Sequence, residues 1–251
     1  MTNTNRTIAR LAVFAVLTVM VTSAASAYVL LSPARKWFST PRLVHVDNGG
    51  LASVTDGDGG VSATLGAVTA WNNAPGGPVL SVTSSQADNT AIVRGDGVSN
   101  LEFSDPFGVC SGNCIAATFT GFYNTGQTGT CGSLNVVAIT DADIVFNTSF
   151  NFNTVAEGSC SSEIYLESVV THEVGHLIGL GHSNQQAALM YPSVAFCDNK
   201  PLGTDDTAGR NALYNCSGGG GGCKPAGQTC TANGECCSGS CKGKPGAKKC
   251  K

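Results

Sequence analysis

Most apolar residues in the middle of the chain fall in short runs that predict β-strands. The runs cover residues 37–46, 79–83, 90–94, 115–122 and 136–146, and segments rich in Gly, Asn, Asp and Ser separate them. Apolar residues at helical spacing predict two helices, at 61–71 and 162–179, the second with Ser161 or Ser162 as N-cap and Glu163 in its first turn. This order predicts an α+β domain, in which a twisted sheet and two main helices precede an irregular lower part.

The first 27 residues have the features of a secretory signal peptide. Arg6 and Arg10 precede an apolar run, and the small residues Ala25-Ser26-Ala27 after it match a cleavage site. Cleavage there would start the mature chain at Tyr28 and predicts a secreted protein. The uncharged stretch 11–31 is also long enough to span a bilayer, so an uncleaved membrane anchor is the second interpretation.

Glycine and cysteine positions divide the rest of the chain. Residues 28–216 have the size of one domain, residues 217–222 form a flexible Ser-Gly linker, and residues 223–251 form a short tail. All twelve cysteines follow residue 109, six in each part, which is typical of disulfides formed in an oxidising compartment. In the larger part, sequence proximity suggests the pairs Cys110 with Cys114, Cys131 with Cys160, and Cys197 with Cys216, although six cysteines allow many other pairings.

The segment His172-Glu173-Val174-Gly175-His176-Leu177-Ile178-Gly179-Leu180-Gly181-His182 has the spacing of a catalytic zinc site. His172 and His176 lie four residues apart, so one face of a helix can present both rings to one ion, with Glu173 beside it. Gly179 can adopt a left-handed conformation that ends the helix and turns the chain back, which would bring His182 to the same ion. Three protein ligands leave one position for water, as in catalytic zinc sites.

This segment resembles the active site of the metzincin metallopeptidases, and the residues around it resemble the matrixin branch, which includes the matrix metalloproteinases. Ser183 follows His182 as in matrixins, and residues 188–192 are similar to the matrixin Met-turn, with Met190 as the methionine beneath the metal ligands. Residues 205–214 are similar to the closing helix of the family, and residues 141–147 to the last strand before the active-site helix. The resemblance implies that Tyr191 and Pro192 wall the pocket for a substrate side chain.

The ligand set predicts a secreted zinc-dependent metalloendopeptidase that acts on proteins or peptides. A water activated by one zinc ion would attack the scissile carbonyl, and Glu173 would accept its proton as general base and pass it to the departing amine. The family resemblance implies that the substrate lies extended along a sheet edge, near residues 115–120.

Two features differ from the animal matrixins. His45 is the only histidine outside the zinc segment and fits a strand, so a second, structural zinc site has no credible ligand set. No cysteine lies between residues 28 and 107, which excludes latency through a propeptide thiol in this chain. Structural calcium is a further candidate, with Asp96, Asp105, Asp141 and Asp143 as weak ligands, but we interpret these aspartates as surface residues.

The tail is too short to fold on an apolar core alone, so its six cysteines must supply the constraint. Their spacing, Cys-x6-Cys-x5-Cys-Cys-x3-Cys-x8-Cys, resembles the knottin or inhibitor cystine knot family. The resemblance implies the pairs Cys223 with Cys237, Cys230 with Cys241, and Cys236 with Cys250. The tail has a net charge of +5 and residues 28–222 one of −10, so the lysines would either attach the protein to an anionic surface or simply keep the module soluble.

Two functions from different classes therefore stay open. The first is a secreted metallopeptidase whose tail serves in targeting. The alternative is a secreted toxin-like or binding protein in which the knottin is the active module. In either case we expect a monomer without a nucleic acid partner.

Overall fold

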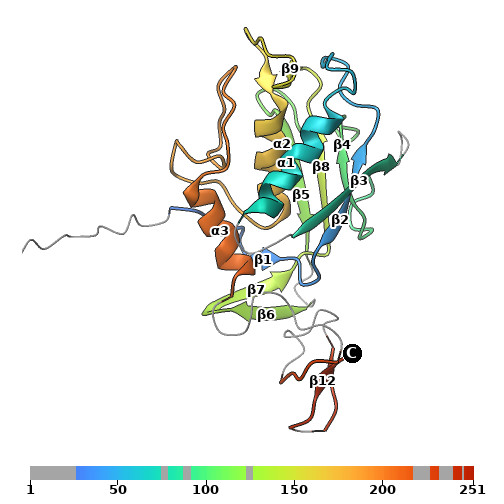
Figure 1. Cartoon of the computed structure of the whole chain (residues 1–251), viewed down its shortest axis with the longest axis vertical. Coiled ribbons are helices and arrows are strands. Elements are labelled where there is room, and N and C mark those ends of the chain that lie inside the picture. Colours follow the sequence, from blue (N-terminus) through green and yellow to red (C-terminus); the bar gives the residue numbers. More distant parts are fainter. Residues whose placement is uncertain are drawn as a thin grey trace, which may run out of the picture.

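The computed structural model describes residues 27–74, 79–86, 92–122, 127–216, 227–231, 240–244 and 246–251. Its main unit contains a five-stranded sheet in the order β3-β2-β4-β8-β5. These strands are Leu80–Gln86, Arg42–Asp47, Ser99–Glu102, Asp141–Phe146 and Ala116–Gly121. Neighbouring strands are parallel except β5, which is antiparallel to β8 and lies at the end of the order. Helices α1 (Val61–Asn73) and α2 (Leu166–Leu177) lie side by side on one face of the sheet (Figure 1).

β8 is buried along its whole length, and its two faces have different surroundings. Ala142, Ile144 and Phe146 belong to the main core, whereas Val145 belongs to a smaller cluster with Ile92. Successive residues of a strand point to opposite faces of the sheet. The main core therefore lies between the sheet and the two helices, and the chain around residue 92 covers the opposite face.

Three buried aromatic side chains fix the position of α2 through hydrogen bonds to backbone carbonyls. Trp71 Nε1 of α1 donates to Thr171 O at 2.7 Å, and Trp37 Nε1 donates to Leu177 O at 3.0 Å. Tyr214 OH donates to Ile178 O, just after the helix, at 2.9 Å. Carbonyls at the end of a helix have no partner within it, so the last two bonds satisfy groups that would otherwise be buried unpaired. Residues from both ends of the main unit thus hold one helix.

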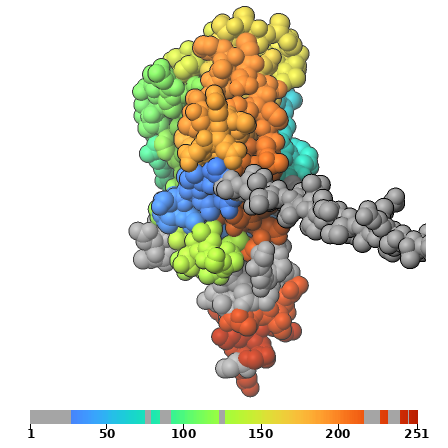
Figure 2. All heavy atoms as spheres, turned by 90° about the vertical axis from the view of Figure 1, so that its left-hand side faces the viewer, coloured from blue at the N-terminus to red at the C-terminus, as the bar shows by residue number. Residues whose placement is uncertain are grey.

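A smaller sheet and the last helix complete the main unit. The sheet has the order β1-β7-β6, with the strands Arg35–Lys36, Leu134–Ala138 and Thr128–Cys131, and α3 (Thr204–Tyr214) packs against β1 and β6. The short strands β9 (Phe152–Asn153) and β10 (Ile164–Tyr165) pair directly before α2. Figure 2 shows the loops after α2 (orange) directly above the N-terminal segment (blue), where Gly181 N donates to Val29 O.

The α+β prediction is confirmed for the main unit, but several predicted boundaries are wrong. The active-site helix begins at Leu166 because Ile164 pairs with Phe152 in a strand and Glu163 Oε2 accepts the backbone N–H groups of Ser161 and Ser162. The run 136–146 is divided between β7 and β8, which belong to different sheets. Residues 92–94 form no strand, residues 37–41 precede β2, and the short polar strands β4 and β6 were not predicted.

The described part of the tail contains a small antiparallel ladder. β11 (Cys241–Lys242) pairs with β12 (Lys249–Cys250). The predicted signal peptide falls almost entirely on residues 1–26, which lie outside the described residues. Among the helices of the described part, none has the length and apolar character needed to cross a bilayer.

Candidate metal centre

Three histidine rings converge at the C-terminal half of α2. His172 and His176 extend from successive turns of the helix, and His182 reaches them after the chain has turned back. Nε2 of His176 lies 3.1 Å from Nε2 of His172 and 3.2 Å from Nε2 of His182. Zinc–nitrogen bonds of about 2.0–2.1 Å in tetrahedral geometry place ligand nitrogens roughly 3.3 Å apart. The spacing of the three nitrogens therefore fits one zinc ion.

The hydrogen bonds of the two helical rings determine which nitrogen faces the centre. His172 Nδ1 lies 2.8 Å from Leu189 O, and His176 Nδ1 lies 2.8 Å from Leu180 O. A carbonyl oxygen only accepts hydrogen bonds, so Nδ1 of each of these two rings carries the proton. Nε2 of each ring is then unprotonated, and its lone pair faces the centre between the three rings. Burial lowers the pKa of all three histidines, that of His172 to about 4. Neutral rings with converging lone pairs are the donor set that a divalent cation requires.

The turn that delivers His182 depends on Gly179. Its φ angle is +109°, and a Cβ at this position would lie 2.1 Å from Arg35 O. Gly179 N donates to His176 O, and Leu180 N donates to Gly175 O, so the chain reverses directly after the helix. A side chain would oppose both the dihedral angle and the close approach of the N-terminal segment.

Met190 is buried against α2, which we call the zinc helix because it carries His172 and His176. A Cβ at Gly175 would lie 2.3 Å from Met190 Sδ, so only glycine allows the thioether to pack this closely. The carboxylate of Asp206 accepts the backbone N–H groups of Leu189 at 3.0 Å and Met190 at 2.9 Å. Leu189 O in turn accepts from His172 Nδ1. The loop that holds Met190 thereby connects α3 to a metal ligand.

Glu173 is buried next to the histidines and points toward the edge strand β5. Thr118 Oγ1 lies 2.6 Å from Glu173 Oε2 and 3.0 Å from Glu173 O. Burial raises the pKa of the Glu173 carboxyl, while the nearby His176 and the hydrogen bond from Thr118 lower it. The carboxyl group is thus held beside the metal ligands in surroundings that favour its accepting a proton.

A cavity of about 250 Å³ opens beside the histidines. Tyr191 and Pro192 line it, as do the metal ligands His172 and His182 and the carboxyl-bearing Glu173. The sequence placed the substrate near residues 115–120 but did not predict the contact of Thr118 with Glu173, and it did not identify Lys200 in the cavity wall. Neither residue belongs to a recognisable motif, and only the folded chain brings them to the histidines.

The family comparisons agree with this geometry. Residues 117–215 match the family model described as Matrixin. Metalloendoproteinase 5-MMP of Arabidopsis thaliana is 30% identical over 157 residues, which are 58% of this chain and 44% of that protein. Metalloendoproteinase 1-MMP of the same plant is 52% identical over 59 residues, 23% of this chain and 16% of that protein. Interstitial collagenase of Bos taurus is 31% identical over 145 residues, 57% of this chain and 26% of that protein.

Residues 117–215 of the main unit are thus similar to the matrixin family. The matched region covers less than half the length of each of these relatives. His172, His176 and His182 lie within this matched region and form the histidine triad that is typical of the matrixin zinc site.

The disulfides of the main unit differ in part from the predicted pairs. Cys110 is bonded to Cys114, but Cys131 is bonded to Cys216 and Cys160 to Cys197. The pairings of Cys131 with Cys160 and of Cys197 with Cys216 were wrong, because folding rather than sequence proximity sets the distances. The end of α3 returns to β6, which brings Cys216 to Cys131, and the loop after Pro192 returns to the start of α2, where Cys197 N donates to Glu163 O.

The tail contains a disulfide between Cys230 and Cys241. Cys250 is also disulfide-bonded. The predicted pairs of Cys223 with Cys237 and of Cys236 with Cys250 involve Cys223, Cys236 and Cys237, which lie outside the described residues. The disulfides of both parts fit maturation in the secretory pathway.

Two of the four calcium candidates in the main unit are not surface residues. Asp141 and Asp143 of β8 are buried, which corrects the interpretation from sequence, whereas Asp96 is exposed and Asp105 is half-buried. Asp141 Oδ2 accepts from Gly95 N at 2.7 Å, and Asp143 Oδ1 accepts from Asn100 N at 3.1 Å. Burial, together with the charge of Asp141, raises the pKa of Asp143 to about 7.

Proposed function

We propose that this chain is a secreted zinc-dependent metalloendopeptidase in which Glu173 is the general base. The observation that carries the proposal is the convergence of three neutral imidazoles next to one buried carboxyl group. Such an arrangement leaves one position near Glu173 for water.

When bound, zinc lowers the pKa of a water ligand to about 7 and polarises a carbonyl oxygen. Glu173 accepts a proton from the attacking water, whose oxygen forms the new bond to the carbonyl carbon. Glu173 then donates this proton to the departing amine as the peptide C–N bond breaks. The hydrogen bond from Thr118 restricts the carboxylate to the orientation required for both transfers.

The substrate we propose is an extended segment of a protein or peptide. β5 lies at the end of the sheet order, and Ile115 and Ala116 at its start line the cavity. An extended chain that pairs with the outer edge of β5 would pass the histidines and place one side chain against Tyr191 and Pro192. Such pairing favours flexible or unfolded substrates over compact domains.

The E173Q variant tests this function because it removes the base and keeps the shape of the side chain. We expect hydrolysis of casein or gelatin to be lost while one zinc ion per chain remains by elemental analysis. A chelator should abolish the hydrolysis by the unchanged protein, and added zinc should restore it. Turnover by E173Q at the wild-type rate, or wild-type activity without metal, would contradict the proposal.

We further propose the domain boundaries 1–27 for a signal peptide, 28–216 for the catalytic domain, 217–222 for a linker and 223–251 for a knottin-like module. The bond between Cys230 and Cys241 and the pairing of β11 with β12 support the last of these. Disulfide mapping of the oxidised protein would test the module, since a partner other than Cys236 for Cys250 would contradict a knottin.

The tail is proposed to attach the enzyme to an anionic surface. Lys242, Lys244, Lys249 and Lys251 are all exposed in this short segment, where clustered positive charge attracts polyanions. Deletion of residues 217–251 should reduce retention on anionic vesicles or acidic polysaccharide at low salt and leave casein hydrolysis intact. A chain with the four lysines changed to Gln is the matched control, and equal retention of all three proteins would refute attachment by charge.

A further inference from the structure

The wall of the cavity beside the histidines carries a positive charge, on Lys200. Much of the wall is apolar, from Val169, Leu189, Pro192 and Val194. Lys200 is the only lysine or arginine among the described residues that line it. The proposed reaction does not explain why a cationic side chain lies in this partly enclosed, largely apolar wall.

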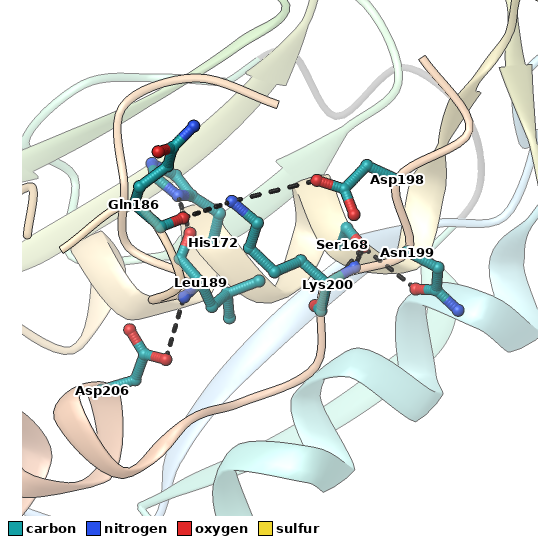
Figure 3. A network of polar contacts seen from close by, with 8 residues as sticks. All are labelled: Ser168, His172, Gln186, Leu189, Asp198, Asn199, Lys200 and Asp206. Atoms are coloured by element: carbon teal, nitrogen blue, oxygen red, sulfur yellow. Dashed lines mark hydrogen bonds and ion pairs between the residues drawn. The ribbon is translucent and has the colours of Figure 1, made fainter. Parts of the chain in front are cut away.

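The backbone of Lys200 is fixed to the zinc helix. Lys200 N donates to Ser168 Oγ at 2.6 Å, and Ser168 Oγ donates to Asn199 Oδ1 at 3.0 Å (Figure 3). Ser168 is buried on α2, one turn before His172. The disulfide between Cys160 and Cys197 ties the same loop to the segment before α2. The backbone of Lys200 is therefore held in a fixed position relative to the metal ligands.

The side chain of Lys200 extends across the cavity wall toward the loop before Met190. Its Nζ donates to Gln186 O at 3.0 Å and lies 5.6 Å from the centre of the Tyr191 ring. In Figure 3 the side chain of Lys200 lies alongside Leu189 and His172.

The charge of Lys200 is only weakly compensated. Its one ion pair among the described residues is with Asp198 Oδ2, at 3.9 Å, and the Asp198 side chain is 44% exposed whereas that of Lys200 is 17% exposed. Such solvent-exposed pairs contribute little, about 0–1 kcal/mol. An ammonium group has three N–H donors, so the bond to Gln186 O and the contact with Asp198 leave one for a ligand. Glu173, which also lines the cavity, accepts a hydrogen bond from Thr118 on the β5 side.

We propose that Lys200 is a specificity-determining residue, which selects substrates with an acidic side chain next to the scissile bond. The inference rests on the proposed peptidase function, because the cavity adjoins Glu173 and the zinc ligands. A Glu or Asp side chain that enters between the apolar walls meets the ammonium group at the far side and forms a charge-assisted hydrogen bond. A Lys or Arg side chain in the same place is repelled.

The test compares the zinc-loaded full chain on peptides that differ at one position. A cleavage profile on a denatured proteome first identifies which flanking residue is selected. Quenched peptides with Glu, Gln, Leu or Lys at that position then give four values of kcat/KM. Glu and Gln have the same shape, so their ratio reports the charge alone. We expect Glu to exceed Gln by about fivefold or more, the factor that corresponds to the upper end of exposed ion pairs.

Three variants distinguish recognition of the substrate charge by Lys200 from a purely structural role of Lys200 in its loop. K200R should keep the Glu preference, K200M should bring the Glu to Gln ratio near one, and K200E should favour the Lys peptide. Thermal midpoints of unfolding show whether each variant is folded. If K200M does not fold, the ratio of kcat/KM for the Glu and Gln peptides with the unchanged protein is sufficient to test the proposal. Hydrolysis with equal values for Glu and Gln would overturn this inference and leave the proposed function standing. Absence of hydrolysis of every peptide by zinc-loaded protein would overturn both.

Discussion

The hydroxyl group of Thr118 lies 2.6 Å from Oε2 of Glu173 and donates a hydrogen bond to it. The two residues come from the edge strand and from the zinc helix, 55 positions apart. β5 is therefore positioned both to pair with a substrate and to orient the group that would move the proton. Hydrogen bonds to charged groups contribute about 1.5–3 kcal/mol, so the loss of this one should be measurable.

Removal of the Thr118 hydroxyl should reduce kcat with little change in KM. Val has the shape of Thr without the hydroxyl, so T118V should lose roughly tenfold or more in kcat. T118S keeps the donor and should recover most of the activity. Steady-state kinetics on one peptide, with thermal midpoints for both variants, provide the measurement. A T118V enzyme with an unchanged kcat would show that the bond does not orient Glu173.

Substitution of Gly175 should damage the metal site through Met190. A Cβ there would lie 2.3 Å from Met190 Sδ, 2.9 Å from its Cε and 3.1 Å from Cζ2 of Trp71. Overpacking of a buried contact costs about 1–3 kcal/mol, so G175A should lower both the midpoint of unfolding and the zinc content.

Gly66 provides the matched control for this substitution. It lies in α1, and a Cβ there would meet nothing within 4 Å. G66A should therefore stabilise the fold by up to about 1 kcal/mol. Equal stability of the two variants would contradict the close contact between Met190 and the helix.

The buried Asp143 should make stability depend on pH. Its pKa is raised to about 7 in the folded protein, whereas an unfolded aspartate titrates near about 3.9. Between these values the unfolded chain loses the proton first, so the contribution of this group to the free energy of unfolding falls as pH rises from about 4 to 7. D143N should remove this fall, and its gain over the wild type should reach on the order of 2–4 kcal/mol above pH 7.

Denaturant titrations of D143N and wild type across this pH range provide the measurement. D198N, which changes an exposed carboxylate, is the matched control. A wild-type protein that calcium stabilises, while D143N does not respond, would contradict this interpretation. It would make Asp141 and Asp143 ligands of a cation instead.

The three disulfides of the main unit should differ in their effect on stability. They join residues separated by 85, 37 and 4 positions, with Cys131–Cys216 the longest and Cys110–Cys114 the shortest. The entropy of loop closure predicts losses of about 4–5, 4 and 2 kcal/mol when each pair is replaced by Ser. Unfolding of the three double variants under equal conditions would show this order. A larger loss for the shortest loop would mean that packing, not loop closure, dominates.

The zinc ligands could be predicted from sequence because the helix and one turn fix their spacing locally. The family resemblance implied that Met190 lies beneath the metal ligands. The contact of Met190 with Gly175 explains why a glycine occupies this position of the helix. Thr118 and Lys200 could not be predicted, since each reaches the site only through sheet pairing or through the loop that Cys197 ties to Cys160. The polar strand β4 was missed because its residues lack the apolar alternation that marks a strand.

The close approach of Arg35 O to Gly179 has a consequence for the order of assembly. The turn before His182 packs on a segment that lies more than a hundred positions earlier in the chain, and contacts of such long separation slow folding because a long loop must close first. A chain in which this contact has not yet formed therefore lacks a complete ligand set. Hydrolysis by a nascent molecule would have to wait until both ends of the domain have met.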